Sequence, residues 1–255
     1  MVERPRVVVG VGASVDGKVA LVRDALLMRE PSTGIWAGMT VQVEDSVGTD
    51  VLQVVREKYG CDAILEGSGS LVAEGETPEE LPAYDGEVGV LYEHFLPREV
   101  VERGLPSRMW FTVVDGRGRV RWTEKHEGWD ALVLVSRATP VEYLAYLRRE
   151  GICYLVAGDE RVDLAQAIAA MGAELGVECL LSTAGGGLNG ALLRADLIDG
   201  LYLTIAPALI GGLGTPSVMD GVPLALGEAP TRLRLLSVQH DSGGTVRLHY
   251  DVDRG

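Results

Sequence analysis

The sequence predicts an α/β fold with a largely parallel, twisted sheet flanked by helices and a C-terminal antiparallel hairpin. Between residues 131 and 195, short aliphatic runs alternate with amphipathic helical patterns, as in successive βαβ units. The run at residues 6–12 (RVVVGVG) is continuously apolar, which is typical of a strand covered on both faces. Near the end, runs at 231–240 and 245–252 flank Asp241-Ser-Gly-Gly244, a sequence typical of a hairpin turn.

The same patterns place the individual elements. Strands are expected at residues 6–12, 61–65, 108–114, 131–135, 152–157, 179–181, 224–226, 231–240 and 245–252. Helices are expected at residues 46–58, where Ser46 would be the N-cap, and at 141–150, 163–175 and 189–195. Residues 23–39 should contain no long helix, because Pro31, Gly34 and Gly38 interrupt them.

Composition and charge restrict the classes of function. A chain of 255 residues with 47% hydrophobic residues has ample core for one domain over residues 1–255. Its 37 acidic against 23 basic residues give a net charge of −14, which argues against a nucleic-acid partner. The apolar runs are too short for a membrane span, and no signal-peptide pattern follows Met1, so we expect a cytoplasmic protein with a small-molecule substrate.

The cysteines and histidines show no metal-ligand spacing, so no metal site is expected. The three cysteines lie in apolar contexts and are interpreted as small core residues. His240 and His249 fall on expected edge strands, where we expect them at the surface.

A long acidic stretch interrupts the regular pattern. Residues 59–97 contain no Lys or Arg, and Pro78, Pro82 and Pro97 keep much of the stretch from regular structure. We interpret residues 71–107 as a solvated acidic excursion at the edge of the fold, with a lid over the active site as the alternative.

The glycines at 185–190 form the strongest candidate for a binding site. The spacing Gly185-x-Gly187-x-x-Gly190 stands where the strand at 179–181 leads into the helix at 189–195. Glycine lets another group approach the backbone closely, and the first N–H groups of a helix attract phosphate. Residues 205–212 lack the downstream carboxylate of a Rossmann fingerprint. A glycine-rich turn needed only for packing is the alternative.

Two further turns follow expected strands. The turn at 13–18 offers Asp16 as a proton donor or substrate anchor, and Lys18 as its charge partner or an anion contact. The turn at 115–119 carries Arg117 and Arg119, whose guanidinium groups suit a cofactor phosphate. The alternative is an ordinary solvated turn at 13–18 and a simple hairpin turn, formed by Gly116 and Gly118, at 115–119.

Three segments in order resemble a known family. Residues 12–20 (GASVDGKVA), 62–70 (DAILEGSGS) and 180–212 are similar to motifs of the reductase domain of the bifunctional riboflavin-biosynthesis deaminase-reductase. That domain has a dihydrofolate reductase-like fold, and the resemblance extends over the whole chain. It implies an NADPH-dependent oxidoreductase that acts as a homodimer.

The resemblance also implies roles for particular residues. By position, Ser14 and Thr183 would contact the substrate, and the cofactor would contact Gly12, Trp36, Ser70, Glu74, Gly185, Gly186, Gly187, Leu188, Asn189 and Gly190. Arg117 at the 2′-phosphate is added from its charge and position alone.

This sequence departs from the family pattern where the family holds its substrate. Thr183 stands where the family has a glutamate, and the acidic stretch replaces an Asp-Pro pair and a following arginine. The family's ribosylaminopyrimidine phosphate is the first substrate candidate. An unphosphorylated imine or carbonyl compound is the second, because a phosphate needs cationic partners. A third hypothesis is that the chain is a non-catalytic nucleotide-binding protein.

Overall fold

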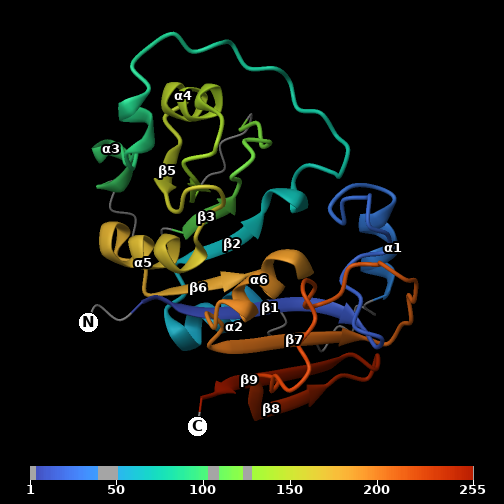
Figure 1. Ribbon diagram of the computed structural model, residues 1–255. Coiled ribbons are helices and arrows are strands. Elements are labelled where there is room, and N and C mark those ends of the chain that lie inside the picture. Colours follow the sequence, from blue (N-terminus) through green and yellow to red (C-terminus); the bar gives the residue numbers. More distant parts are fainter. Residues whose placement is uncertain (1–3, 40–50, 103–108, 123–127, 255) are drawn as a thin grey trace. The chain divides into compact units, whose positions relative to one another are not determined.

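The computed structural model describes residues 4–39, 51–102, 109–122 and 128–254. The chain forms two compact units. Unit 1 comprises Met1–Pro5 and Asp62–Leu180, and unit 2 comprises Arg6–Cys61 and Leu181–Gly255. Among the described residues there are nine strands, most of them paired in parallel, so the predicted α/β fold class is confirmed (Figure 1).

Unit 1 has four parallel strands in the order β5-β4-β3-β2. These strands are β2 (Ala63–Gly67), β3 (Met109–Val114), β4 (Trp129–Val135) and β5 (Cys153–Val156). Its helices are α3 (Arg98–Val101), α4 (Val141–Arg149) and α5 (Leu164–Leu175), with 3₁₀ turns η1 (Ser68–Ser70) and η2 (Gly89–Tyr92). Both α4 and α5 follow directly on a strand, as expected for βαβ units.

The core of unit 1 explains its continuous apolar strands. Val133 and Val135 of β4 pack with Tyr154 of β5 and with Tyr143 and Leu147 of α4 in one buried cluster. Helix α5 begins where the Asp163 carboxylate accepts a hydrogen bond from the backbone N–H of Gln166 (3.0 Å) and ends at Gly176, whose φ is +68°.

The acidic stretch is tied to unit 1. Leu81, Tyr84 and Tyr92 pack against the cluster formed by α4 and β5, and Figure 1 shows the stretch between β2 and α3 running around α4. The Arg121 guanidinium donates to the Glu79 carbonyl (2.6 Å). The described part of the stretch is thus anchored to unit 1, while its interpretation as a solvated excursion and its use as a lid both stay predictions.

Unit 2 contains the expected C-terminal hairpin. Its strand order is β1-β7-β9-β8, in which β1 and β7 are parallel and the other two pairings are antiparallel. These strands are β1 (Arg6–Ser14), β7 (Gly200–Ala206), β8 (Arg232–His240) and β9 (Val246–Asp253). Its helices are α1 (Ser32–Met39), α2 (Val51–Tyr59) and α6 (Gly186–Arg194), and β6 (Cys179–Ser182) leads into it from unit 1.

Several local predictions need correction. Helix α6 begins at Gly186 instead of Asn189, and residues 224–226 form no strand. His249 is buried, with 3% of its surface exposed, because β9 lies between β7 and β8 and is not an edge strand. His240 is exposed on β8, as predicted. The proposed N-cap Ser46 lies outside the described residues.

All three cysteines are free and buried, which confirms them as core residues. In the part of the chain that the structure describes, no helix has both the length and the hydropathy to cross a membrane.

Candidate functional site

The glycine turn, residues 183–190, comprises the connection after β6 and the first residues of α6 in unit 2. Gly185 is the N-cap of α6, with extended backbone angles. Asn189 is fully buried; its side-chain oxygen accepts from the Ser182 hydroxyl (2.7 Å) and its amide donates to the Ala184 carbonyl (2.8 Å). Asn189 therefore fastens the strand end to the helix with its side chain, and the expected contact of this residue with a cofactor stays a prediction.

The glycines of this turn have two different environments. A Cβ at Gly190 would lie 1.6 Å from the Asp220 carbonyl oxygen, and one at Gly186 would lie 2.0 Å from the Ser217 carbonyl oxygen. Gly185 and Gly187 are exposed, and a Cβ at either would meet nothing within 4 Å. Gly186 and Gly190 thus serve packing, whereas Gly185 and Gly187 leave the first turn of α6 open.

The open side of the turn suits a diphosphate. The first N–H groups of a helix lack intrahelical acceptors and stand at the positive end of its dipole. The carboxylate of Asp220 lies against Gly186 on the packed side, where it accepts from the Ser217 hydroxyl (2.6 Å). Because Gly185 and Gly187 have no side chains, an anion can approach the backbone closely there.

A second group of expected cofactor residues lies on the neighbouring strand. Strands β6 and β1 are neighbours, and a Cβ at Gly10 would lie 2.7 Å from Leu181 Cδ1. Gly12, two residues further along β1, is exposed, and its Cβ would lie 3.8 Å from Trp36 Cζ2. The structure therefore brings Gly12 and Trp36 together.

The turn at Ser14–Lys18 has most of its polar groups occupied. The Asp16 carboxylate accepts from the Ser14 hydroxyl (2.6 Å) and from the backbone N–H groups of Ile210 (3.1 Å) and Gly211 (2.6 Å). These hydrogen bonds, that from Ser14 first, lower the pKa of Asp16 to about 2. The carboxylate is therefore ionised at neutral pH.

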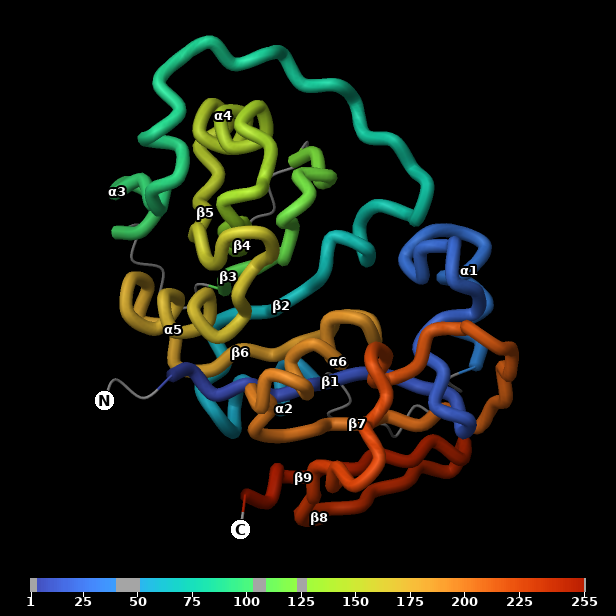
Figure 2. Tube along the Cα trace, viewed as in Figure 1, coloured from blue at the N-terminus to red at the C-terminus, as the bar shows by residue number. Residues whose placement is uncertain are grey.

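Three predictions for this turn change accordingly. An ionised Asp16 is a poor proton donor at neutral pH, so only its role as a substrate anchor stays a prediction. The Lys18 ammonium donates to the Thr215 carbonyl (3.1 Å), which makes it a tether of the segment after β7. Ser14 is 1% exposed and occupied by the turn, which argues against direct substrate contact. Figure 2 shows the segment after β7 beside the segment after β1.

The remaining expected cofactor residues belong to unit 1. The Arg119 guanidinium donates to the carbonyls of Val72 (2.7 Å) and Ala73 (2.6 Å), and so ties the turn after β3 to the segment that carries Ser70 and Glu74. Arg117 on the same turn is exposed, as is Glu74. In unit 1, Arg119 thus holds the segment that carries Ser70 and Glu74, and the exposed Arg117 lies two residues before Arg119 on the turn after β3.

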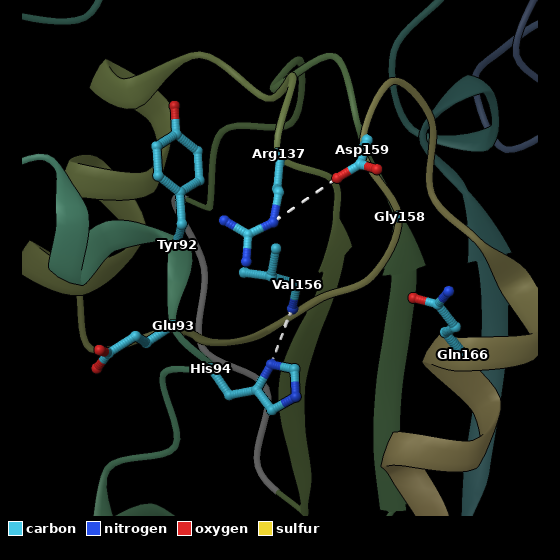
Figure 3. Close-up of a pocket in the computed structure, with 8 residues that line it drawn as sticks. All are labelled: Tyr92, Glu93, His94, Arg137, Val156, Gly158, Asp159 and Gln166. Atoms are coloured by element: carbon cyan, nitrogen blue, oxygen red, sulfur yellow. Dashed lines mark hydrogen bonds and ion pairs between the residues drawn. The ribbon is translucent and has the colours of Figure 1, made fainter.

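Sequence reasoning missed a pocket in unit 1. It lies among the segment after η2, the loops that follow β4 and β5, and the first turn of α5 (Figure 3). Arg137 and Gly158 each come just after a predicted strand, so the rule that ligands bind at strand ends, applied there, would have pointed to this place. Among the described residues, no three His, Cys, Asp or Glu side chains are grouped as metal ligands would be.

Comparison with known proteins defines first the fold and then the family. The fold is that of a solved pyrimidine reductase-like protein from Corynebacterium diphtheriae, at a TM-score of 0.62 and 18% identity over 98% of this chain and 93% of that chain. The RibD C-terminal domain matches residues 5–247, and the chain belongs to this family.

Two curated relatives carry the same name, 2,5-diamino-6-ribosylamino-4(3H)-pyrimidinone 5′-phosphate reductase. The protein from Archaeoglobus fulgidus is 28% identical over 86% of this chain and 87% of its own length. That from Methanothermobacter thermautotrophicus is 26% identical over 86% of this chain and 85% of its own length. The resemblance found in the sequence is thereby confirmed, and this chain is similar to reductases over most of its length.

Proposed function

We propose that this protein is an NADPH-dependent reductase of 2,5-diamino-6-ribosylamino-4(3H)-pyrimidinone 5′-phosphate. The family membership and the names of both curated relatives support the reaction. The observation that carries the cofactor is the first turn of α6, where Gly185 and Gly187 are exposed and have open space in place of a Cβ. The exposed Arg117 supports NADPH over NADH, because a guanidinium binds a 2′-phosphate bidentately.

The chain's part in this reaction is binding and orientation. When bound, NADPH supplies a hydride to the carbon of a C=N or C=O group. The N–H groups at the start of α6 would hold the diphosphate, and Gly12 beside Trp36 would leave room for the cofactor next to β1. Asp16, held ionised by its neighbours, would anchor a donor group of the substrate.

An unphosphorylated imine or carbonyl substrate is the second candidate, and one observation favours it. The cations near the Ser14–Lys18 turn already bind backbone: Lys18 donates to the Thr215 carbonyl (3.1 Å) and Arg23 to the Gly214 carbonyl (3.2 Å). A substrate phosphate would have to displace these contacts. Thr183, where the family has a glutamate, points the same way.

Steady-state NADPH oxidation separates the candidates. We expect turnover with the ribosylaminopyrimidine 5′-phosphate and at least tenfold lower kcat/KM with its dephosphorylated form, a difference of about 1.4 kcal/mol. Equal turnover of both, or turnover only on a panel of simple imines and carbonyls, would favour the second candidate. NADPH binding without turnover of any of these compounds would favour the third hypothesis, a non-catalytic nucleotide-binding protein.

We further propose that the protein forms a homodimer through β8. This strand lies at the end of the strand order of unit 2, and its Leu233, Leu235, Leu236 and Val238 side chains are 37–54% exposed. An exposed apolar edge strand is prone to pair with a second chain. Sedimentation should give a dimer for the native chain and a monomer for Leu235→Glu; a monomeric native chain would contradict this proposal.

A further inference from the structure

The pocket in unit 1 is bounded by four separate segments of that unit. It has a volume of about 430 Å³, within the range of small-molecule sites. Its lining residues are Tyr92, Glu93, His94, Arg137, Val156, Gly158, Asp159 and Gln166. Backbone hydrogen bonds from Arg137 to Gly158 (3.0 Å) and from Ala138 to Asp159 (2.8 Å) hold the loops after β4 and β5 together, so these two walls of the pocket are joined.

His94 presents a hydrogen-bond donor to this pocket. Its Nδ1 accepts a hydrogen bond from the backbone N–H of Val156 (3.1 Å), as Figure 3 shows. An imidazole that accepts at Nδ1 carries its proton at Nε2 when neutral. The contact with β5 therefore fixes both the orientation of the ring and the position of the N–H group.

Arg137 supplies a positive charge that forms only a weak ion pair with Asp159. Its Nε lies 3.8 Å from the Asp159 carboxylate, and the two side chains are 62% and 90% exposed. An ion pair of this length and exposure contributes little, so an incoming anion can replace it at small cost. In Figure 3 the guanidinium lies between Tyr92 and Asp159, Val156 lies between it and His94, and the Glu93 carboxylate points away from both.

Gln166 adds a third donor from a different element. It lies in the first turn of α5, its own N–H is held by the Asp163 carboxylate, and its side-chain amide is exposed beside the pocket (Figure 3). Three donors on three elements thus line one pocket, together with the Asp159 carboxylate, which pairs weakly with Arg137, and the Glu93 carboxylate.

We propose that this pocket binds the phosphate or carboxylate group of a small metabolite, at a ligand site lined by residues of unit 1 alone. Arg137 would bind two oxygens of the anion with its planar guanidinium, and His94 Nε2 and the Gln166 amide would each donate to it. The space beside Val156 and Gly158 takes the body of the ligand.

Titration of the full-length protein with inorganic phosphate or with acetate, at constant ionic strength, tests this site. The ¹⁵N resonances of the His94 ring, assigned with His94→Gln, report on binding. We expect a saturable shift in the native protein and about tenfold weaker binding in Arg137→Gln, because a charge-assisted hydrogen bond is lost. Arg149→Gln is the matched control, since Arg149 is exposed on α4 and pairs with Glu150. Tighter binding of phosphate would indicate a phosphorylated metabolite, and tighter binding of acetate a carboxylate.

Three results would overturn the proposal. The first is the absence of a saturable shift with either ion, and the second is equal affinity in Arg137→Gln and the native protein. The third is loss of the shift when NADPH is present at saturation, which would assign the pocket to the cofactor. The first two results are read without NADPH, so they hold whether or not the proposed reductase activity is found.

Discussion

Two turns of unit 2 follow neighbouring strands, and both have residues suited to a binding site, but the structure uses them differently. In the Ser14–Lys18 turn, the Asp16 carboxylate has three hydrogen-bond donors and Lys18 is bound to the Thr215 carbonyl. In the glycine turn, Gly185 and Gly187 are exposed with open space around them. Residue type at a strand end therefore marks a candidate, and the partners already in place decide whether it can take a ligand.

The largest effect is expected where the glycine turn is packed. A Cβ in Gly190→Ala would lie 1.6 Å from the Asp220 carbonyl oxygen, so the backbone must move, at a cost of more than about 3 kcal/mol in the free energy of unfolding. Gly187→Ala is the control: its Cβ meets nothing, and alanine should leave stability unchanged or raise it by up to about 1 kcal/mol. Urea denaturation measures both. A Gly190→Ala protein as stable as the native one would contradict the packing assigned to this face.

The turn after β3 offers a similar contrast between two arginines. Arg119→Ala removes two hydrogen bonds to the Val72 and Ala73 carbonyls and should lower the free energy of unfolding by about 1–3 kcal/mol. Arg117→Ala should leave stability unchanged and weaken NADPH binding about tenfold, with no change for NADH. If the two substitutions had equal effects on stability and on NADPH affinity, the assignment of a structural role to Arg119 and a binding role to Arg117 would be wrong.

His249 is a buried titratable group whose two ring nitrogens both contact other side chains of the fold. Its Nδ1 lies 3.2 Å from the Lys58 ammonium and its Nε2 lies 2.9 Å from the Tyr59 hydroxyl, while Tyr202 stacks on the ring. Burial, with a smaller effect of Lys58 and Arg6 against Asp251, lowers the pKa of His249 below its usual 6.5.

The unfolded chain therefore binds this proton at a higher pH than the folded chain does. Neutral His249 therefore contributes to the free energy of unfolding above pH 6.5, and this contribution is lost as pH falls from 6.5 through the lowered pKa of the folded state. The loss is at most about 1.4 kcal/mol per pH unit. We expect a flatter profile between neutral pH and this pKa for His249→Gln in urea denaturation. Parallel profiles would show that His249 has no part in the pH dependence.

The smallest effect is expected at Asp16. Asp16→Asn removes the charge that Ser14, Ile210 and Gly211 stabilise, so it should lower the melting temperature at neutral pH. Because the folded pKa is about 2 against 3.8, the native protein loses this advantage as pH falls from 3.8 towards 2, and the two melting temperatures should converge there. Unchanged turnover in Asp16→Asn would remove its proposed role as a substrate anchor.

Regular elements could be predicted because their signals are local. The apolar runs of β1, β4 and β5 and the helical pattern of α5 are visible in the sequence itself. The sequence predicts the start of α6 three residues too late, because glycine is a poor helix former. Only the packed segment at Ser217–Asp220 explains why the helix includes Gly186.

The state of the site residues depended on partners that are distant in the sequence. Asp16 is bound by backbone groups at Ile210 and Gly211, and His249 is buried because β9 lies inside its sheet. The sequence near a residue holds no signal for a partner that is distant along the chain. Part of the wall of the pocket beside Arg137 also comes from a distant segment, the acidic stretch, although Arg137 and Gly158 at their strand ends are a local signal for it.

The central claim is that the open side of the glycine turn holds the diphosphate of a pyridine nucleotide. Calorimetric titration of NADPH into the native protein and Gly187→Ala, both confirmed as folded, tests it most directly. We predict saturable binding to the native protein and at least tenfold weaker binding to the variant, because the added methyl group occupies the space in which the diphosphate approaches the backbone. Absence of binding to the native protein, or equal affinity in the two, would contradict the account.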